Sequence, residues 1–101
     1  MLEKLKESSI ETLVDALISI DNREECYSFL EDLCTVTEVK AMAQRLEVAK
    51  MLEEHIVYSD IVQKTGASTA TISRVNKCIN YGCDGYRKIL AKLSEKEKCN
   101  E

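Results

Sequence analysis

Residues 58–80, which read YSDIVQKTGASTATISRVNKCIN, decide the fold of this 101-residue chain. A short helical pattern runs into Gly66, and a second begins almost at once at a run of small hydroxyl residues. Glycine reaches the positive φ of a tight turn without steric cost, and Ser68 is suited to cap the second helix. Two short helices joined in this way predict a helix-turn-helix, whose second helix lies in the major groove of DNA.

Apolar residues in this stretch recur at helical spacing. Ile61 and Val62 belong to the first helix, and Ile72, Val75 and Ile79 recur at i, i+3 and i+7 in the second, so we expect them to face the core. The hydroxyl-rich and basic residues then face outward. We predict that DNA is bound by Ser68, Thr69, Ala70, Thr71, Ser73, Arg74 and Lys77.

The residue types on this predicted outer face suit DNA. Short side chains let the backbone approach base edges, the methyl groups of Thr and Ala contact thymine methyls, and hydroxyls bond bases or phosphates. Lys77 suits a phosphate, and the free amides of the helix N-terminus can hold another. The alternative is that STATIS (68–73) is merely an exposed polar helix start, but the run has poor helix propensity, which favours a functional role.

Charge divides between the two halves of the chain. Residues 1–54 hold 6 basic and 13 acidic side chains, a net of −7, whereas residues 55–101 hold 8 and 5, a net of +3. Phosphate attraction depends on where positive charge lies more than on the total of −4. A helical face can also be basic merely to stay solvated, so charge alone leaves DNA binding open.

The composition predicts one all-α domain of about six helices over residues 1–101. Proline is absent, glycine occurs only three times and alternating apolar and polar runs are missing. We expect residues 1–54 to form core and dimerisation helices, including helices over about 4–20 and 36–54. The helix-turn-helix follows at 58–80, and a last helix over 84–95 then frays into a polar tail.

Several classes of protein are not expected from this sequence. The five cysteines form no CxxC and the single His55 is distant from them, so we expect reduced thiols and no metal site. No apolar stretch approaches the ~20 residues of a membrane span. The start of the chain lacks a signal peptide's layout, which predicts a cytoplasmic protein with no membrane association. The sequence shows neither a group of acid–base residues typical of an active site nor a glycine-rich phosphate-binding loop. We therefore do not expect an enzyme or a bound cofactor.

Three segments of the chain resemble a known family. LCTVTEVKAMAQRLEVAKML (33–52), TGASTATISRVNKCINYG (65–82) and DGY (84–86) are similar to the Trp repressor superfamily, and most closely to its YerC/YecD-type TrpR-related branch. The resemblance covers residues 10–95. It implies an intertwined homodimer that presents two recognition helices to a two-fold DNA site.

The resemblance also implies a ligand pocket, at which this chain differs from the family's namesake in two residues. In the family's namesake an amino-acid corepressor lies beside the recognition helix, and three polar positions of that pocket carry over as Thr35, Arg45 and Arg74. The namesake has glycine directly after the second arginine, whereas this chain has Val75, and Cys78 replaces a nearby serine. Since close-packed sites absorb added bulk poorly, we expect Val75 to fill the pocket and tryptophan binding to be lost.

The roles of the two arginines stay open at this point. Arg74 can line a ligand pocket, contact phosphate or pair with an acidic neighbour, and we interpret Arg45 as structural. The sequence leaves open whether any small-molecule effector binds. It predicts a sequence-specific transcriptional regulator, a repressor by resemblance, that binds double-stranded DNA as a homodimer. The alternative is a helix-turn-helix module that mediates protein–protein interaction.

Overall fold

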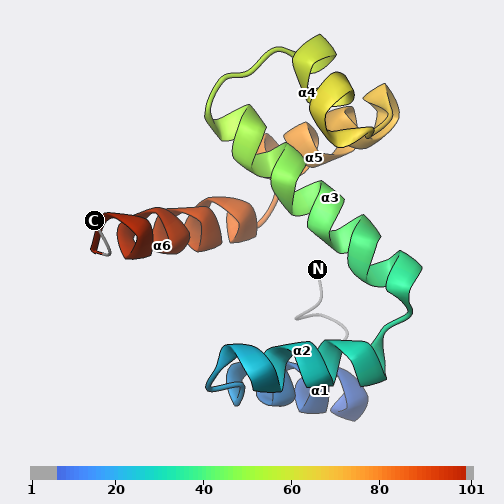
Figure 1. Ribbon diagram of the computed structural model, residues 1–101, viewed down its shortest axis with the longest axis vertical. Helices are drawn as coiled ribbons and strands as arrows, with labels where there is room; N and C mark the ends of the chain where they lie inside the picture. The colour runs from blue at the N-terminus through green and yellow to red at the C-terminus, as the bar shows by residue number, and fades with distance from the viewer. Residues whose placement is uncertain (1–6, 100–101) are drawn as a thin grey trace. The chain divides into compact units, whose positions relative to one another are not determined.

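The computed structural model describes residues 7–99, with side chains through residue 97, and there it holds six α-helices and no strand (Figure 1). The all-α prediction of about six helices is therefore confirmed. The helices are α1 (Ser8–Ile18), α2 (Arg23–Leu33), α3 (Val36–Glu53), α4 (Tyr58–Thr65), α5 (Thr69–Tyr81) and α6 (Gly85–Cys99).

The chain divides into two compact units, residues 1–36 and 37–101. The division expected from the sequence falls elsewhere, after residue 54, because α3 shares its core with the helix-turn-helix. Whether residues 1–101 behave as a single domain stays a prediction.

The first unit holds α1 and α2. Asn22 is the cap of α2, since its side chain accepts a hydrogen bond from the Glu25 backbone N–H at 2.8 Å. Residues 4–6 of the expected first helix lie outside the described residues, and α1 ends at Ile18. No residue of α1 or α2 is buried within the described chain. Their large apolar side chains are exposed at Leu13, Val14, Leu17, Ile18, Tyr27 and Leu33.

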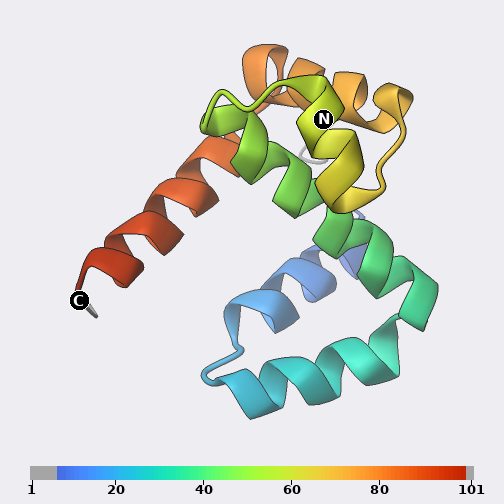
Figure 2. The ribbon, with the colours of Figure 1, turned by 45° about the horizontal axis from the view of Figure 1, so that its top comes forward.

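The core of the second unit lies where α3, α4 and α5 meet (Figure 2). Its fully buried large side chains are Val48 of α3, Ile61 of α4, and Ile72 and Val75 of α5. Completing the core are Ala49, Met51, Ala67 and Ile79. Burial of these methyl and methylene groups, worth about 1.5–3 kcal/mol for each large side chain, fixes the two short helices against α3.

The apolar stripe of α3 is covered along only part of its length. Val39, Met42, Leu46, Ala49 and Leu52 recur at helical spacing and Ala41, Val48 and Met51 widen the stripe, but Met42 and Leu46 are exposed. The buried part is the C-terminal half, at Val48, Ala49 and Met51, because α4 and α5 cover only that half of the helix.

The end of α3 is a Schellman motif. The His55 N–H donates to the Leu52 carbonyl and the Ile56 N–H donates to the Met51 carbonyl, both at 3.0 Å. His55 takes φ 62°, the left-handed conformation that this motif requires. Because Ile56 packs against the core cluster that contains Met51, the motif directs the chain back toward α4.

The last helix, α6, packs on the same core through Tyr86 and Leu90. Arg87 Nε lies 3.1 Å from Glu53 Oε1, so an exposed ion pair also joins α6 to α3. We expected the last helix to end at about residue 95, but α6 continues to Cys99. Glutamate and lysine dominate residues 94–99, and their high helix propensity accounts for the extension.

Candidate nucleic-acid interface

The turn between α4 and α5 is built on Gly66. It adopts φ 72° and ψ 5°, and its N–H donates to the Val62 carbonyl at 2.9 Å, which caps α4. A side chain at this position would meet no atom within 4 Å, so glycine is required by the backbone conformation and not by crowding.

Two residues that the sequence did not single out brace this turn. Thr65 Oγ1 donates to the Ile61 carbonyl at 2.7 Å and accepts from the Ala67 N–H at 3.1 Å. Gln44 Nε2 of α3 donates to the Thr65 carbonyl at 3.1 Å. These polar contacts tie the turn to the long helix beneath it, and no periodic pattern in the sequence could have revealed a contact between residues 21 positions apart.

The first turn of α5 is closed by two hydroxyl residues. Ser68 Oγ accepts from the Thr71 N–H at 3.1 Å and donates to Thr71 Oγ1 at 3.0 Å. The predicted Ser68 cap is confirmed. Thr71 is half-buried, so both of these predicted DNA-binding residues also hold the start of the helix.

Helix α5 has two distinct faces. Ile72, Val75 and Ile79 are buried as predicted, and they lie on the side that packs on the core. The remaining predicted DNA-binding residues are all exposed: Thr69, Ala70, Ser73, Arg74 and Lys77. The structure therefore brings short, hydroxyl-bearing and cationic groups together on one open face of one helix.

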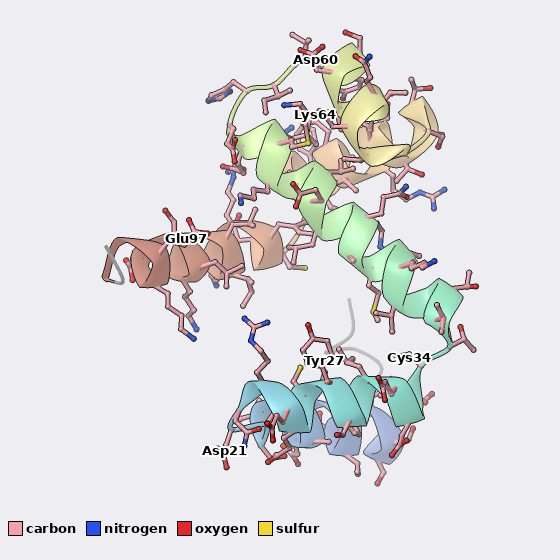
Figure 3. The ribbon with its side chains drawn as sticks, viewed as in Figure 1. Asp21, Tyr27, Cys34, Asp60, Lys64 and Glu97 are labelled. Carbon is pink, nitrogen blue, oxygen red and sulfur yellow. The ribbon has the colours of Figure 1, made fainter. Side chains whose placement is uncertain are left out.

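The stretch of sequence that contains α5 is basic. Residues 61–92 include Lys64, Arg74, Lys77, Arg87, Lys88 and Lys92, with Asp84 as the acidic residue, a net of +5. Lys64, on α4 (Figure 3), lines a hollow between α3 and α4 together with Glu47 and Thr65. Such a concentration of positive charge attracts phosphate even though the whole chain is acidic.

The three residues carried over from the ligand pocket lie in different surroundings. Thr35 belongs to the first unit, while Arg45 and Arg74 belong to the second and are exposed. Val75 is 1% exposed and packs in the core cluster.

Other kinds of site are not seen within residues 7–97. No group of three metal-ligating side chains lies together there. The cysteines in this range, Cys26, Cys34, Cys78 and Cys83, are free thiols. Within residues 7–99, none of the helices has the length and apolar character needed to cross a membrane.

Comparison with known proteins identifies the family. The family model described as Trp repressor protein matches residues 8–94, which is most of the chain. The chain belongs to the Trp repressor family. Membership places it among DNA-binding regulators.

Individual relatives extend this match within the Trp repressor family. The uncharacterized protein YerC of Bacillus subtilis strain 168 is 48% identical over 96 residues, which cover 95% of this chain and 92% of YerC. A crystal structure of a candidate Trp repressor from Staphylococcus aureus has a TM-score of 0.88 and 47% identity, covering 93% of this chain and 94% of that one. A TrpR-like protein from Eubacterium eligens has a TM-score of 0.87 and 52% identity, covering 91% and 95%. The resemblance to a YerC-type TrpR-related protein is confirmed.

Proposed function

We propose that this protein is a sequence-specific transcriptional repressor that reads duplex DNA with α5. The observation that carries the proposal is the division of α5 into a buried apolar side and an exposed side formed by Thr69, Ala70, Ser73, Arg74 and Lys77. A recognition helix needs this division, because one side must be held rigidly while the other contacts base edges and phosphates.

Each exposed residue has a role in the proposal. Thr69, Ala70 and Ser73 lie near the start of α5, where small side chains admit the backbone to the floor of the major groove and read base edges. Arg74 and Lys77 contact phosphates. Ser68 and Thr71 act indirectly, because their mutual hydrogen bonds fix the first turn whose free amides face a phosphate.

We propose further that the protein acts as a homodimer in the cytoplasm. Exposed apolar side chains on α1 and α2 support this, because surfaces of this kind usually mark an association site. Two recognition helices related by a two-fold axis would contact half-sites about 34 Å apart. Leu17→Asp should yield a monomer in sedimentation analysis and abolish binding to the paired half-sites, while a dimeric Leu17→Asp variant would contradict this part of the proposal.

The proposed regulator does not need tryptophan. Val75 supports this, since its buried side chain stands where the namesake has glycine and leaves no room for an added ring. The affinity for DNA should be equal with and without saturating tryptophan, and a rise in affinity on adding tryptophan would refute the claim.

Selection of bound duplexes from a random pool is the main test. We expect one recurring sequence, bound in preference to scrambled duplexes at physiological salt, and lower transcription from a promoter that carries it. Replacing Thr69 or Ser73 by alanine should change the preferred bases. Binding without sequence discrimination would refute the proposal. Capture of a stoichiometric protein partner without duplex affinity would favour the interaction-module alternative.

A salt titration tests the phosphate contacts separately. Lys77→Ala should weaken binding to every sequence and reduce the slope of log K against log salt by about one. Lys50→Ala is the matched control, because Lys50 is an exposed lysine that lies on α3, away from the open face of α5. An unchanged slope for Lys77→Ala, or an equal loss for both variants, would refute the assigned role of Lys77.

A further inference from the structure

We propose that Tyr81 is a further DNA-contacting residue, whose phenol hydroxyl donates a hydrogen bond to a backbone phosphate at the edge of each half-site. This inference rests on the proposed function and adds a contact that lies outside the residue set from which that function was argued.

Tyr81 has unusual exposure for an aromatic residue. Its side chain is 85% exposed, more than Ile18 at 76% or any other exposed large hydrophobic residue in the described chain. A tyrosine normally buries most of its ring and presents only its hydroxyl to water, so an aromatic side chain left open in this way is informative.

The position of Tyr81 on α5 places it on the recognition side. It lies four residues after Lys77 and seven after Arg74, and residues at these spacings share one face of a helix. The buried residues Ile72 and Val75 lie on the opposite side. Tyr81 is therefore the last side chain along the open face of α5.

The distance along the helix indicates which part of DNA Tyr81 meets. Eleven residues separate it from Ala70, which corresponds to about 16 Å at a rise of 1.5 Å per residue. The major groove is only about 12 Å wide. When the start of α5 enters the groove, its far end must lie over the sugar-phosphate strand that borders the groove, where tyrosine is a known phosphate donor.

The end of α5 holds Tyr81 in a fixed place. The Gly82 N–H donates to the Cys78 carbonyl at 2.9 Å and ends the helix directly after Tyr81. A Cβ at position 82 would approach that carbonyl oxygen to 2.3 Å, so the tight cap depends on glycine. The side chain of the preceding residue is also bonded within the helix: Asn80 Nδ2 donates to the Asn76 backbone carbonyl at 3.0 Å and to Asn76 Oδ1 at 3.2 Å. The backbone of Tyr81 is thus fixed at the end of α5, with its side chain open to a ligand.

Tyr81→Phe and Tyr81→Ala test the proposal in the full-length protein, with the duplex obtained by selection as the probe. Tyr27→Phe is the matched control, because Tyr27 is a second exposed tyrosine, 60% accessible, on α2 (Figure 3). The variant removes only the hydroxyl and keeps the ring, so the apolar surface of α2 that we propose for dimerisation is retained, and sedimentation analysis checks that it is still a dimer. Circular dichroism and the unfolding midpoint establish that each variant is folded. Since residue 81 is exposed, both variants should unfold as the wild type does.

The expected signature differs from that of a lysine contact. Tyr81→Phe should weaken binding about fivefold for selected and scrambled duplexes alike, the size expected for one hydrogen bond. The salt slope should stay that of the wild type, because a neutral phenol displaces no counterion. Phosphate ethylation interference should show one flanking phosphate whose modification weakens the wild type but not Tyr81→Phe.

The outcomes separate the two proposals. If the wild type discriminates sequences but Tyr81→Phe binds with the same affinity and the same interference pattern, the role of Tyr81 is refuted and the proposed function stands. A loss shared equally by Tyr27→Phe would also refute it. If the wild type shows no sequence discrimination, the proposed function itself fails and the phosphate contact fails with it.

Discussion

Gly66 and His55 share the left-handed conformation although only His55 carries a side chain, which allows a reciprocal test of this backbone requirement. Gly66 ends α4 at φ 72°, and His55 follows α3 at φ 62°. The left-handed region costs a residue with a Cβ about 1–2 kcal/mol, whereas glycine enters it freely. Gly66→Ala should therefore destabilise the protein and His55→Gly should stabilise it.

The magnitude for Gly66→Ala follows from the open space around that residue. Because a Cβ there would meet no atom within 4 Å, no steric term adds to the backbone cost. Alanine also lowers the conformational entropy of the unfolded chain, and this effect offsets about 0.4–1 kcal/mol of the backbone cost. The net loss in the free energy of unfolding should be about 1 kcal/mol. For His55→Gly the same two terms reverse, and the expected gain is about 0.5–1 kcal/mol.

Urea unfolding followed by circular dichroism measures both changes, with every variant at the same protein concentration because association shifts apparent stability. A change of about 1 kcal/mol in a chain of this size moves the thermal midpoint by roughly 4–8 °C. Gly66→Asn is a graded control, since asparagine tolerates the left-handed region better than alanine and should lose less. If Gly66→Ala is as stable as the wild type, or if His55→Gly is less stable, the assigned backbone requirement is wrong.

Three further predictions concern the core, the helix end and the surface. Val75→Gly should lower the free energy of unfolding in urea by about 3–4 kcal/mol, because it loses apolar burial, leaves a cavity and weakens helix propensity. Val75→Ala should lose less, and a near-neutral Val75→Gly would show that this position is not packed. Gly82→Ala should cost about 1–3 kcal/mol, since its Cβ would approach the Cys78 carbonyl oxygen to 2.3 Å, and an unchanged midpoint would contradict the tight cap. Glu53→Gln should change stability by less than about 0.5 kcal/mol, because the pair with Arg87 is exposed; a loss above 1 kcal/mol would mean that the pair is structurally important.

The recognition helix could be predicted from the sequence because local rules govern it. A glycine at the turn, a serine cap and apolar residues at i, i+3 and i+7 each restrict the backbone within a few residues, and all three agree in 58–80. The helix bounds followed closely, with α4 and α5 at Tyr58–Thr65 and Thr69–Tyr81.

Features that depend on distant neighbours were harder to predict. Periodicity identified an apolar stripe on α3 but could not show that only its Val48–Met51 portion is covered by α4 and α5. The Gln44–Thr65 hydrogen bond involves two ordinary polar residues far apart in the chain, so no sequence signal marks it. The left-handed conformation of His55 was also not predicted, because histidine in a sequence does not indicate a positive φ as glycine does.

The separation of the two faces of α5 has a consequence for how such proteins diversify. Substitutions at Thr69, Ala70 or Ser73 alter what the helix recognises without removing any atom from the core, so new specificities can arise at little thermodynamic cost. Duplicated genes encoding this scaffold can therefore drift apart in target preference while both products continue to fold. A library randomised at these three codons should consist mostly of well-folded proteins, which makes the scaffold a practical starting point for directed evolution.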